Sequence, residues 1–240
     1  MKTRVWFVVT CALAFGLQAE EWVDRPETFW KDPSFQKAFM GSYGMRAEIE
    51  PRVTVVEKEV MDKVMKLMAE EGGTAKAAAL LEKSIKPASS AVFDFTLANV
   101  HFQEDRLTNA LACYQSAVQK FPSFQRAHKN MALIRIRLGE FEAAIEPLTQ
   151  CIELGANDGL TYGLLGYAYT MTEQYASAES AYRLAIMLQP KTIDWQLGLC
   201  RVLFKQQKYG EAIAMCDALL KHHPSKADYL LLQANAYLGM

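Results

Sequence analysis

The chain has 240 residues, of which 51% are hydrophobic, and its formal net charge at pH 7 is -1. This length and composition supply enough apolar side chains for one sizeable core or a stacked array, in one or two domains. A net charge so close to zero gives no electrostatic reason to expect nucleic acid or an anionic membrane surface as a partner, so we predict neither.

Residues 1–19 have the organisation of a secretory signal peptide. A basic start, MKTR, is followed by an apolar run over residues 5–16 and by LQA before Glu20. The run is shorter than the roughly 20 residues of a membrane-spanning helix. We predict cleavage after Ala19, export to the periplasm or secretion, and no stable membrane span afterwards. Cys11 would permit a lipoprotein, but Thr10 and the short run before it match a lipobox poorly.

Residues 20–52 form a distinct, mostly irregular segment. It is rich in large aromatic residues, namely Trp22, Phe29, Trp30, Phe35, Phe39 and Tyr43. A short helix is expected from Ser34 to Met40, because Phe35 and Phe39 then share one side. Such aromatics either pack on the helices that follow, as an N-terminal cap or in a groove, or form an exposed docking peptide; the first is favoured because exported proteins seldom expose so many.

Residues 53–90 are expected to form a degenerate helical hairpin. The first helix, Val53 to Glu71, is predicted from one apolar face made by Val56, Val60, Val64, Leu67 and Met68, and Gly72 ends it. The second helix, Thr74 to Ile85, carries Ala77, Leu81 and Ser84 on one face and begins at Thr74 or Gly73.

The stretch from Gly159 to Thr192 predicts two helices joined by a short polar turn. Its patterned positions are Tyr162, Leu165, Gly166 and Tyr169 on the first helix, Ala178, Tyr182 and Ala185 on the second, and Pro190 at the end. This pattern resembles the tetratricopeptide signature, W-x2-L-G-x2-Y, then A-x3-F, then P, with Tyr in place of Trp and Phe. The resemblance covers roughly residues 91–240.

The family's period of about 34 residues repeats these positions along the chain. Small residues recur at Ala110, Ala144, Ala178 and Ala212, and at Ala98, Ala132, Gly166 and Cys200. Bulky residues recur at Tyr114, Leu148 and Tyr182, with Cys216 in the same register. The repeats are therefore 91–124, 125–158, 159–192 and 193–226, with a partial repeat over 227–240. The predicted fold is all-α, a right-handed α-solenoid of stacked antiparallel helix pairs.

Cysteine and histidine residues give no catalytic or metal-binding pattern. No CxxC pair occurs among Cys113, Cys151, Cys200 and Cys216, and metal ligation requires clustered Cys and His. Cys200 and Cys216 lie on the two helices of one hairpin, so a disulfide is conceivable, although buried thiols are the favoured interpretation. His101 and His128 are expected in the core or groove. With no catalytic motif present, we predict no enzyme activity, no cofactor and no metal.

The resemblance implies that partners bind the groove formed by the first helix of each repeat. By register, the candidate residues are Phe95, Asn99, Phe102, Arg126, Lys129, Leu133, Arg137, Tyr167, Met171, Arg201, Phe204 and Lys205. They mix apolar and basic side chains, which suits a peptide or helix with hydrophobic anchors and acidic residues. A family subclass that clamps a terminal carboxylate is matched at Asn99 and Asn130, but Phe95 stands where it needs lysine, so we expect no clamp.

The function predicted first is therefore a non-catalytic interaction scaffold, exported to the periplasm, that binds a segment of an envelope-complex partner. An alternative is an accessory module of a longer envelope enzyme or transport complex whose active domain lies beyond Met240. The largely uncharged end, LLLQANAYLGM, fits either an apolar terminal helix or a chain that continues. In a third hypothesis residues 20–52 fill the groove and partners bind the convex side.

Overall fold

The computed structural model describes residues 50–222 and 225–240, which form two compact units, residues 50–156 and residues from 157 onward. All regular structure in these described residues is helical. The predicted leader, the helix expected from Ser34 to Met40 and the other aromatic residues named before Glu50 lie outside the described residues.

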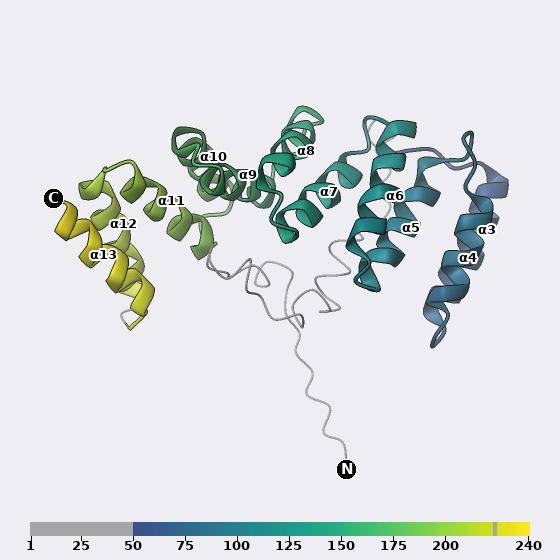
Figure 1. The fold of residues 1–240 in the computed structure, drawn as a ribbon, viewed down its shortest axis with the longest axis horizontal. Helices are drawn as coiled ribbons and strands as arrows, with labels where there is room; N and C mark the ends of the chain where they lie inside the picture. Colours follow the sequence, from purple (N-terminus) through teal and green to yellow (C-terminus); the bar gives the residue numbers. More distant parts are fainter. Residues whose placement is uncertain (1–49, 223–224) are drawn as a thin grey trace, which may run out of the picture. The chain divides into compact units, whose positions relative to one another are not determined.

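The unit of residues 50–156 contains three helix pairs. They are α3 (Val55–Ala69) with α4 (Thr74–Ser84), α5 (Ala91–Gln103) with α6 (Leu107–Lys120), and α7 (Gln125–Arg137) with α8 (Phe141–Glu153). Successive pairs are stacked, because α4 packs on α5 and α6 packs on α7 (Figure 1).

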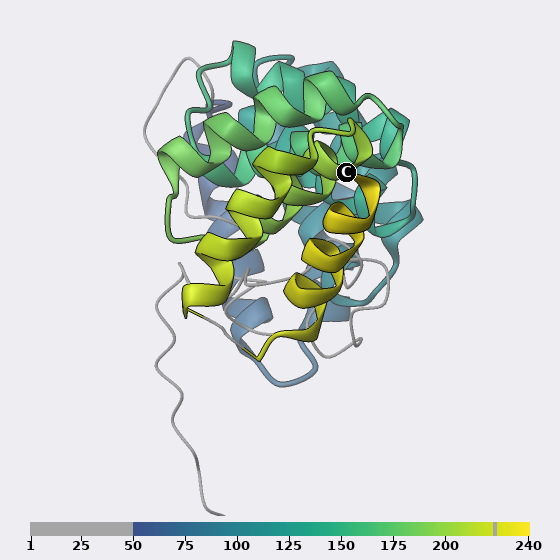
Figure 2. The ribbon, with the colours of Figure 1, turned by 90° about the vertical axis from the view of Figure 1, so that its left-hand side faces the viewer.

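The unit that starts at residue 157 contains two helix pairs and a further helix. They are α9 (Gly159–Met171) with α10 (Tyr175–Leu188), α11 (Ile193–Lys205) with α12 (Tyr209–His222), and α13 (Ala227–Gly239). The second helix α10 packs on α11, and α13 runs antiparallel beside α12 (Figure 2).

Helix positions repeat along both units with one period. First helices begin at Ala91, Gln125, Gly159, Ile193 and Ala227, and second helices begin at Leu107, Phe141, Tyr175 and Tyr209, at intervals of 34 residues in both series. The prediction of an all-α fold of stacked antiparallel helix pairs is thus confirmed. The period reflects one supersecondary unit that is repeated and buried by its neighbours.

The turn inside each of these hairpins has the same backbone conformation. One residue per turn is left-handed, namely Asp105, Gly139, Glu173 and Gln207, with φ between 59° and 77°. The next backbone N–H reaches a carbonyl five residues back, as in Gln174 to Tyr169 at 2.8 Å and Lys208 to Leu203 at 2.9 Å. This is a Schellman closure, which satisfies carbonyls at the end of the first helix.

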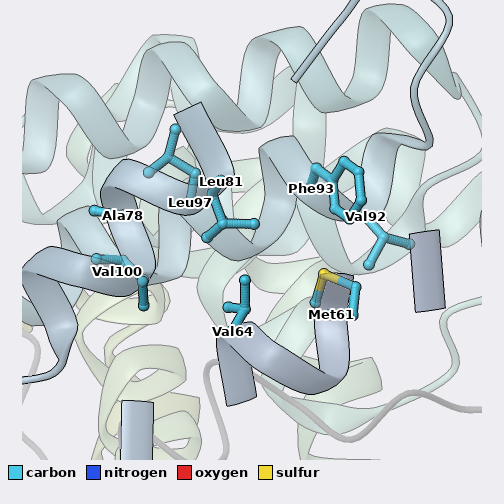
Figure 3. Close-up of a cluster of buried hydrophobic side chains, with 9 residues drawn as sticks. Met61, Val64, Ala78, Leu81, Val92, Phe93, Leu97 and Val100 are labelled. Carbon is cyan, nitrogen blue, oxygen red and sulfur yellow. The ribbon is translucent and has the colours of Figure 1, made fainter. Parts of the chain in front are cut away.

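The helices α3, α4 and α5 share one apolar cluster. Its members include Met61, Val64, Ala78, Leu81, Val92, Phe93, Leu97 and Val100, which point into the space between the three helices (Figure 3). Thr54 and Glu57 start α3 with a capping box, in which Glu57 N–H donates to Thr54 Oγ1 and Thr54 N–H to Glu57 Oε2. The first hairpin is therefore held by a cap at its start and by burial in the middle.

Two sequence predictions for α3 need correction. The helix spans Val55–Ala69 rather than Val53 to Glu71, and Val56, predicted on its buried face, is 70% exposed. The physical reason is length: α3 has 15 residues and its antiparallel partner α4 has 11, so the first turn of α3 extends past the end of α4. Burial consequently starts at Met61.

Glycines of the second unit receive large aromatic rings. A Cβ on Gly166 would lie 2.9 Å from the Tyr182 ring, and one on Gly198 would lie 2.4 Å from Tyr182 Cζ. Gly163 faces the Trp195 ring in the same way, at 2.5 Å. Tyr182 and Trp195 are both buried, with centroids 6.5 Å apart. The backbones of α9 and α11 can approach these rings only because the three positions lack side chains.

The helix α13 exposes apolar residues at positions that are buried in the preceding first helix. Leu231 and Tyr237 are 63% and 58% exposed, whereas Leu197 and Leu203, one period earlier, are each 1% exposed. Its opposite face is packed, since Tyr229 joins Leu197 and Leu219 in an apolar cluster. The terminal helix therefore presents an apolar face to its surroundings.

We predict that Gly198→Ala destabilises the protein by about 1–3 kcal/mol, because the added methyl overlaps the buried Tyr182 ring. Gly210→Ala is the matched control: its Cβ has no atom within 4 Å, and helix propensity favours alanine by up to about 1 kcal/mol. Urea unfolding monitored by circular dichroism measures both changes. Equal unfolding midpoints for the two variants would contradict the close contact between Gly198 and the Tyr182 ring.

Candidate functional site

The predicted groove residues fall in both units. Phe95, Asn99, Phe102, Arg126, Lys129, Leu133 and Arg137 lie in the first unit, on α5 and α7, and Tyr167, Met171, Arg201, Phe204 and Lys205 lie in the second, on α9 and α11. Those on α5 are buried, as is every residue of this helix from Ala91 to Phe102. Leu133 is also buried, and Lys129 is half-buried.

Arg126, near the start of α7, holds a carboxylate against an aromatic surface. Its guanidinium carbon lies 5.3 Å from the ring centroid of Phe95 and 6.0 Å from that of Phe124, and these two centroids are 4.7 Å apart. Arg126 Nε lies 2.6 Å from Glu50 Oε1, and Nη2 donates to Oε2 at 2.6 Å. The guanidinium thus makes one hydrogen bond, through Nη2, and one close ion-pair contact, through Nε, with the same carboxylate.

Burial strengthens this contact. The Arg126 and Glu50 side chains are only 18% and 12% exposed. Water and salt therefore screen this pair less than they screen an exposed pair. The aromatic faces add a cation–π attraction for the guanidinium. The arrangement can therefore hold a carboxylate at a guanidinium that is supported by two buried rings.

Arg137, at the end of α7, repeats the same combination. Its guanidinium carbon lies 5.9 Å from the Phe102 ring, and Nη2 donates to Asp105 Oδ1 at 2.6 Å. Asp105 is the left-handed turn residue between α5 and α6. Two basic side chains of α7 thus each lie over an aromatic residue of α5 and bind a carboxylate.

The two asparagines that match the carboxylate clamp bond inside the protein. The Tyr114 hydroxyl, on α6, donates to Asn99 Oδ1 and accepts a hydrogen bond from Asn130 Nδ2 at 3.0 Å. All three side chains are buried. This network joins α5, α6 and α7, so the two amides serve to align helices.

In the second unit the predicted residues differ in exposure. Tyr167 is buried, Arg201 and Phe204 are half-buried, and Met171 and Lys205 are exposed. The Phe204 ring packs 5.7 Å from that of Tyr209, the first residue of α12. Phe204 is therefore partly committed to holding its own hairpin together.

Sequence reasoning missed two members of the Arg126 site. Glu50 precedes the repeats and is 76 residues from Arg126, so no periodic pattern could pair them. Phe124, the residue before α7, could have been found from its position, because it closes a repeat directly ahead of a first helix.

Burial shifts the pKa of two further titratable groups, Cys113 and His101. Burial raises the pKa of the Cys113 thiol to about 11, which keeps it protonated and poorly nucleophilic at neutral pH. Burial also lowers the pKa of His101. Within residues 50–222 and 225–240, no group of three or more His, Cys, Asp or Glu side chains could hold a metal ion. The helices of the same residues include none with the length and apolarity needed to cross a bilayer.

Comparison with protein families gives one match. The model of the tetratricopeptide repeat protein 21 C-terminal ARM domain matches residues 109–230, slightly more than half of the chain. The chain belongs to this tetratricopeptide repeat family. A comparison of this repeat protein with curated proteins finds no match.

Solved structures similar to this repeat protein share its helical hairpins. A tetratricopeptide repeat protein from Parabacteroides merdae ATCC 43184 has a TM-score of 0.63 and 19% identity, covering 76% of this chain and 73% of its own. MamA from Desulfovibrio magneticus RS-1 has a TM-score of 0.61 and 15% identity, covering 73% and 99%. YrrB, described as having an unusual peptide-binding site, has a TM-score of 0.60 and 19% identity, covering 66% and 82%. At these identities the likeness establishes the fold alone.

We predict that acid destabilises the native protein less in His101→Phe than in the wild type. Because burial lowers the pKa of His101 in the folded protein, the unfolded chain takes up its proton first. The stability that neutral His101 contributes is fully present above about pH 6.5, the pKa of histidine in the unfolded chain. It decreases as the pH falls through that value towards the pKa in the folded protein. Urea unfolding between about pH 8 and pH 5 measures it, and identical pH dependence in both proteins would contradict it.

Proposed function

We propose that this repeat protein is a non-catalytic interaction scaffold of the bacterial periplasm that binds an extended or helical segment carrying large apolar and acidic side chains. The observation that supports it is the Arg126 site, where a guanidinium over Phe95 and Phe124 forms an ion pair and one hydrogen bond with the Glu50 carboxylate. A partner's Asp or Glu would replace Glu50 there, while Phe95 and Phe124, which are themselves buried, hold the guanidinium in place.

The stacked helices favour such binding because the surface is ordered before a partner arrives. Arg126 is oriented by two rings and by Glu50, so binding immobilises few additional side chains. An acidic partner must still compete with Glu50 for the Arg126 guanidinium. The partner class proposed is an envelope protein with an acidic, apolar segment.

We predict that peptides selected by the full chain from a random displayed library contain Asp or Glu beside large apolar residues. Arg126→Gln should weaken their binding by about tenfold or more, the value of one charge-assisted interaction. Glu50→Gln should strengthen it, since the charge of the Glu50 carboxylate no longer competes for Arg126. Fluorescence anisotropy with a selected peptide measures both effects.

The matched control for these variants is Lys63→Gln, which removes an exposed charge from α3. It should leave peptide affinity unchanged, and circular dichroism should show the same helical content in all variants. Selected peptides without acidic residues, or undiminished affinity of Arg126→Gln, would refute the proposed site.

Export is the second part of the proposal, and residues 1–19 motivate it. We predict that expression of the full chain in a Gram-negative host yields a periplasmic protein beginning at Glu20. Cell fractionation and N-terminal sequencing measure this outcome. A protein that retains Met1 and fractionates with the cytoplasm would overturn export while leaving the peptide-binding proposal intact.

A further inference from the structure

Two cysteines face each other in the hairpin of α11 and α12. In three other hairpins the same pair of positions holds a small residue on the first helix and a large one on the second: Ala98 and Tyr114, Ala132 and Leu148, and Gly166 and Tyr182. All of these are buried. The pair in α11 and α12 is Cys200 with Cys216, two residues of equal, intermediate size. The helices are therefore close at a point where both facing side chains end in sulfur.

The two sulfurs are in direct contact. Cys200 Sγ and Cys216 Sγ are 2.8 Å apart, and both residues are fully buried. A disulfide has a sulfur–sulfur length of about 2.05 Å, so bond formation requires a shift of less than about 1 Å. The remaining described cysteines lie elsewhere: Cys151 Sγ donates to the Gln125 carbonyl, and Cys113 packs against the cluster shared by α3, α4 and α5.

We propose that Cys200 and Cys216 form a disulfide that fastens α11 to α12. Both cysteines are on the hairpin against which α13 packs. The bond would therefore hold α11 and α12 together beneath α13. Cross-linking positions 16 residues apart restricts the unfolded chain and thereby favours the folded state.

Bond formation requires an oxidant, and the chemical class proposed is a small or protein disulfide such as glutathione disulfide. Exchange begins when one of the two thiols, for example Cys216, is exposed and loses its proton to solvent. Its thiolate attacks one sulfur of the oxidant, forms a mixed disulfide and releases one thiolate. The deprotonated Cys200 then attacks the Cys216 sulfur and releases the second, so one disulfide is reduced to two thiols as the protein loses two.

Access to the oxidant sets when this exchange occurs. Neither sulfur is exposed in the folded hairpin, so exchange takes place during folding or when α11 and α12 separate locally. Once formed, the buried bond is shielded from reducing thiols for the same reason. A disulfide at this position fits an oxidising compartment.

The test refolds the full chain in a mixture of oxidised and reduced glutathione, then alkylates free thiols in denaturant. We expect an intact mass about 2 Da below that of the reduced chain before alkylation. Peptide mapping should recover Cys200 and Cys216 as one linked peptide, with Cys113 and Cys151 alkylated. Alkylation of both Cys200 and Cys216, or linkage of either to another cysteine, would overturn the proposal.

Thermal unfolding provides the second measurement. The oxidised chain should melt about 5–10 °C higher than the same chain reduced with dithiothreitol in denaturant and then refolded. Cys200→Ala and Cys216→Ala should each abolish the dependence on reductant, whereas the control Cys113→Ala should keep it. An oxidised wild-type chain that melts at the same temperature as the reduced and refolded chain would contradict the proposed disulfide even if the variants fold poorly.

Discussion

The close approach of a helix backbone to a large buried ring is the constraint on which the second unit depends. Tyr182 lies against Gly166 of its own hairpin and against Gly198 of the next, so one ring fixes two successive first helices. Trp195 and Gly163 form a parallel contact between the same helices. Closely packed protein interiors tolerate little change in side-chain volume. The small positions of the repeat are therefore requirements of distance as much as of helix propensity.

The connection between paired helices imposes a second constraint. Three of the four left-handed turn residues are Asp105, Glu173 and Gln207, which adopt φ near 60° without being glycine. Such conformations are costly for residues with a Cβ. They persist because the Schellman hydrogen bonds and the packing of both helices determine the turn from each side. Helix lengths and turns together keep the period constant.

The Arg126 site is built on this rigid frame. Phe95 comes from α5, Phe124 from the residue before α7, and the carboxylate from Glu50 ahead of the first hairpin. Stacking α6 between α5 and α7 brings these parts together, and it also aligns Asn99, Tyr114 and Asn130. A site assembled from several helices in this way has its charged group oriented by the packing of the helices themselves.

The same frame explains why equivalent positions carry different chemistry. At one pair of equivalent positions three hairpins carry a small residue and a large one, whereas the hairpin of α11 and α12 carries Cys200 and Cys216. The pair of positions is kept while the side chains that occupy it vary. Recognition and cross-linking can therefore change from repeat to repeat without altering the helices that support them.

By itself the sequence determined the helix pairs, their period and the small residues of the core, because each repeat encodes the same local pattern several times. It also indicated which side chains of α5 and α7 belong to one region. Only the tertiary structure decided that Val56 is exposed, that Asn99 and Asn130 bond to Tyr114, that Glu50 reaches Arg126, and that two sulfurs meet. These outcomes depend on single contacts between distant residues and on the point where one helix extends beyond the end of its shorter partner. A periodic pattern does not encode such contacts or such differences in length, since both arise only when the helices pack in three dimensions.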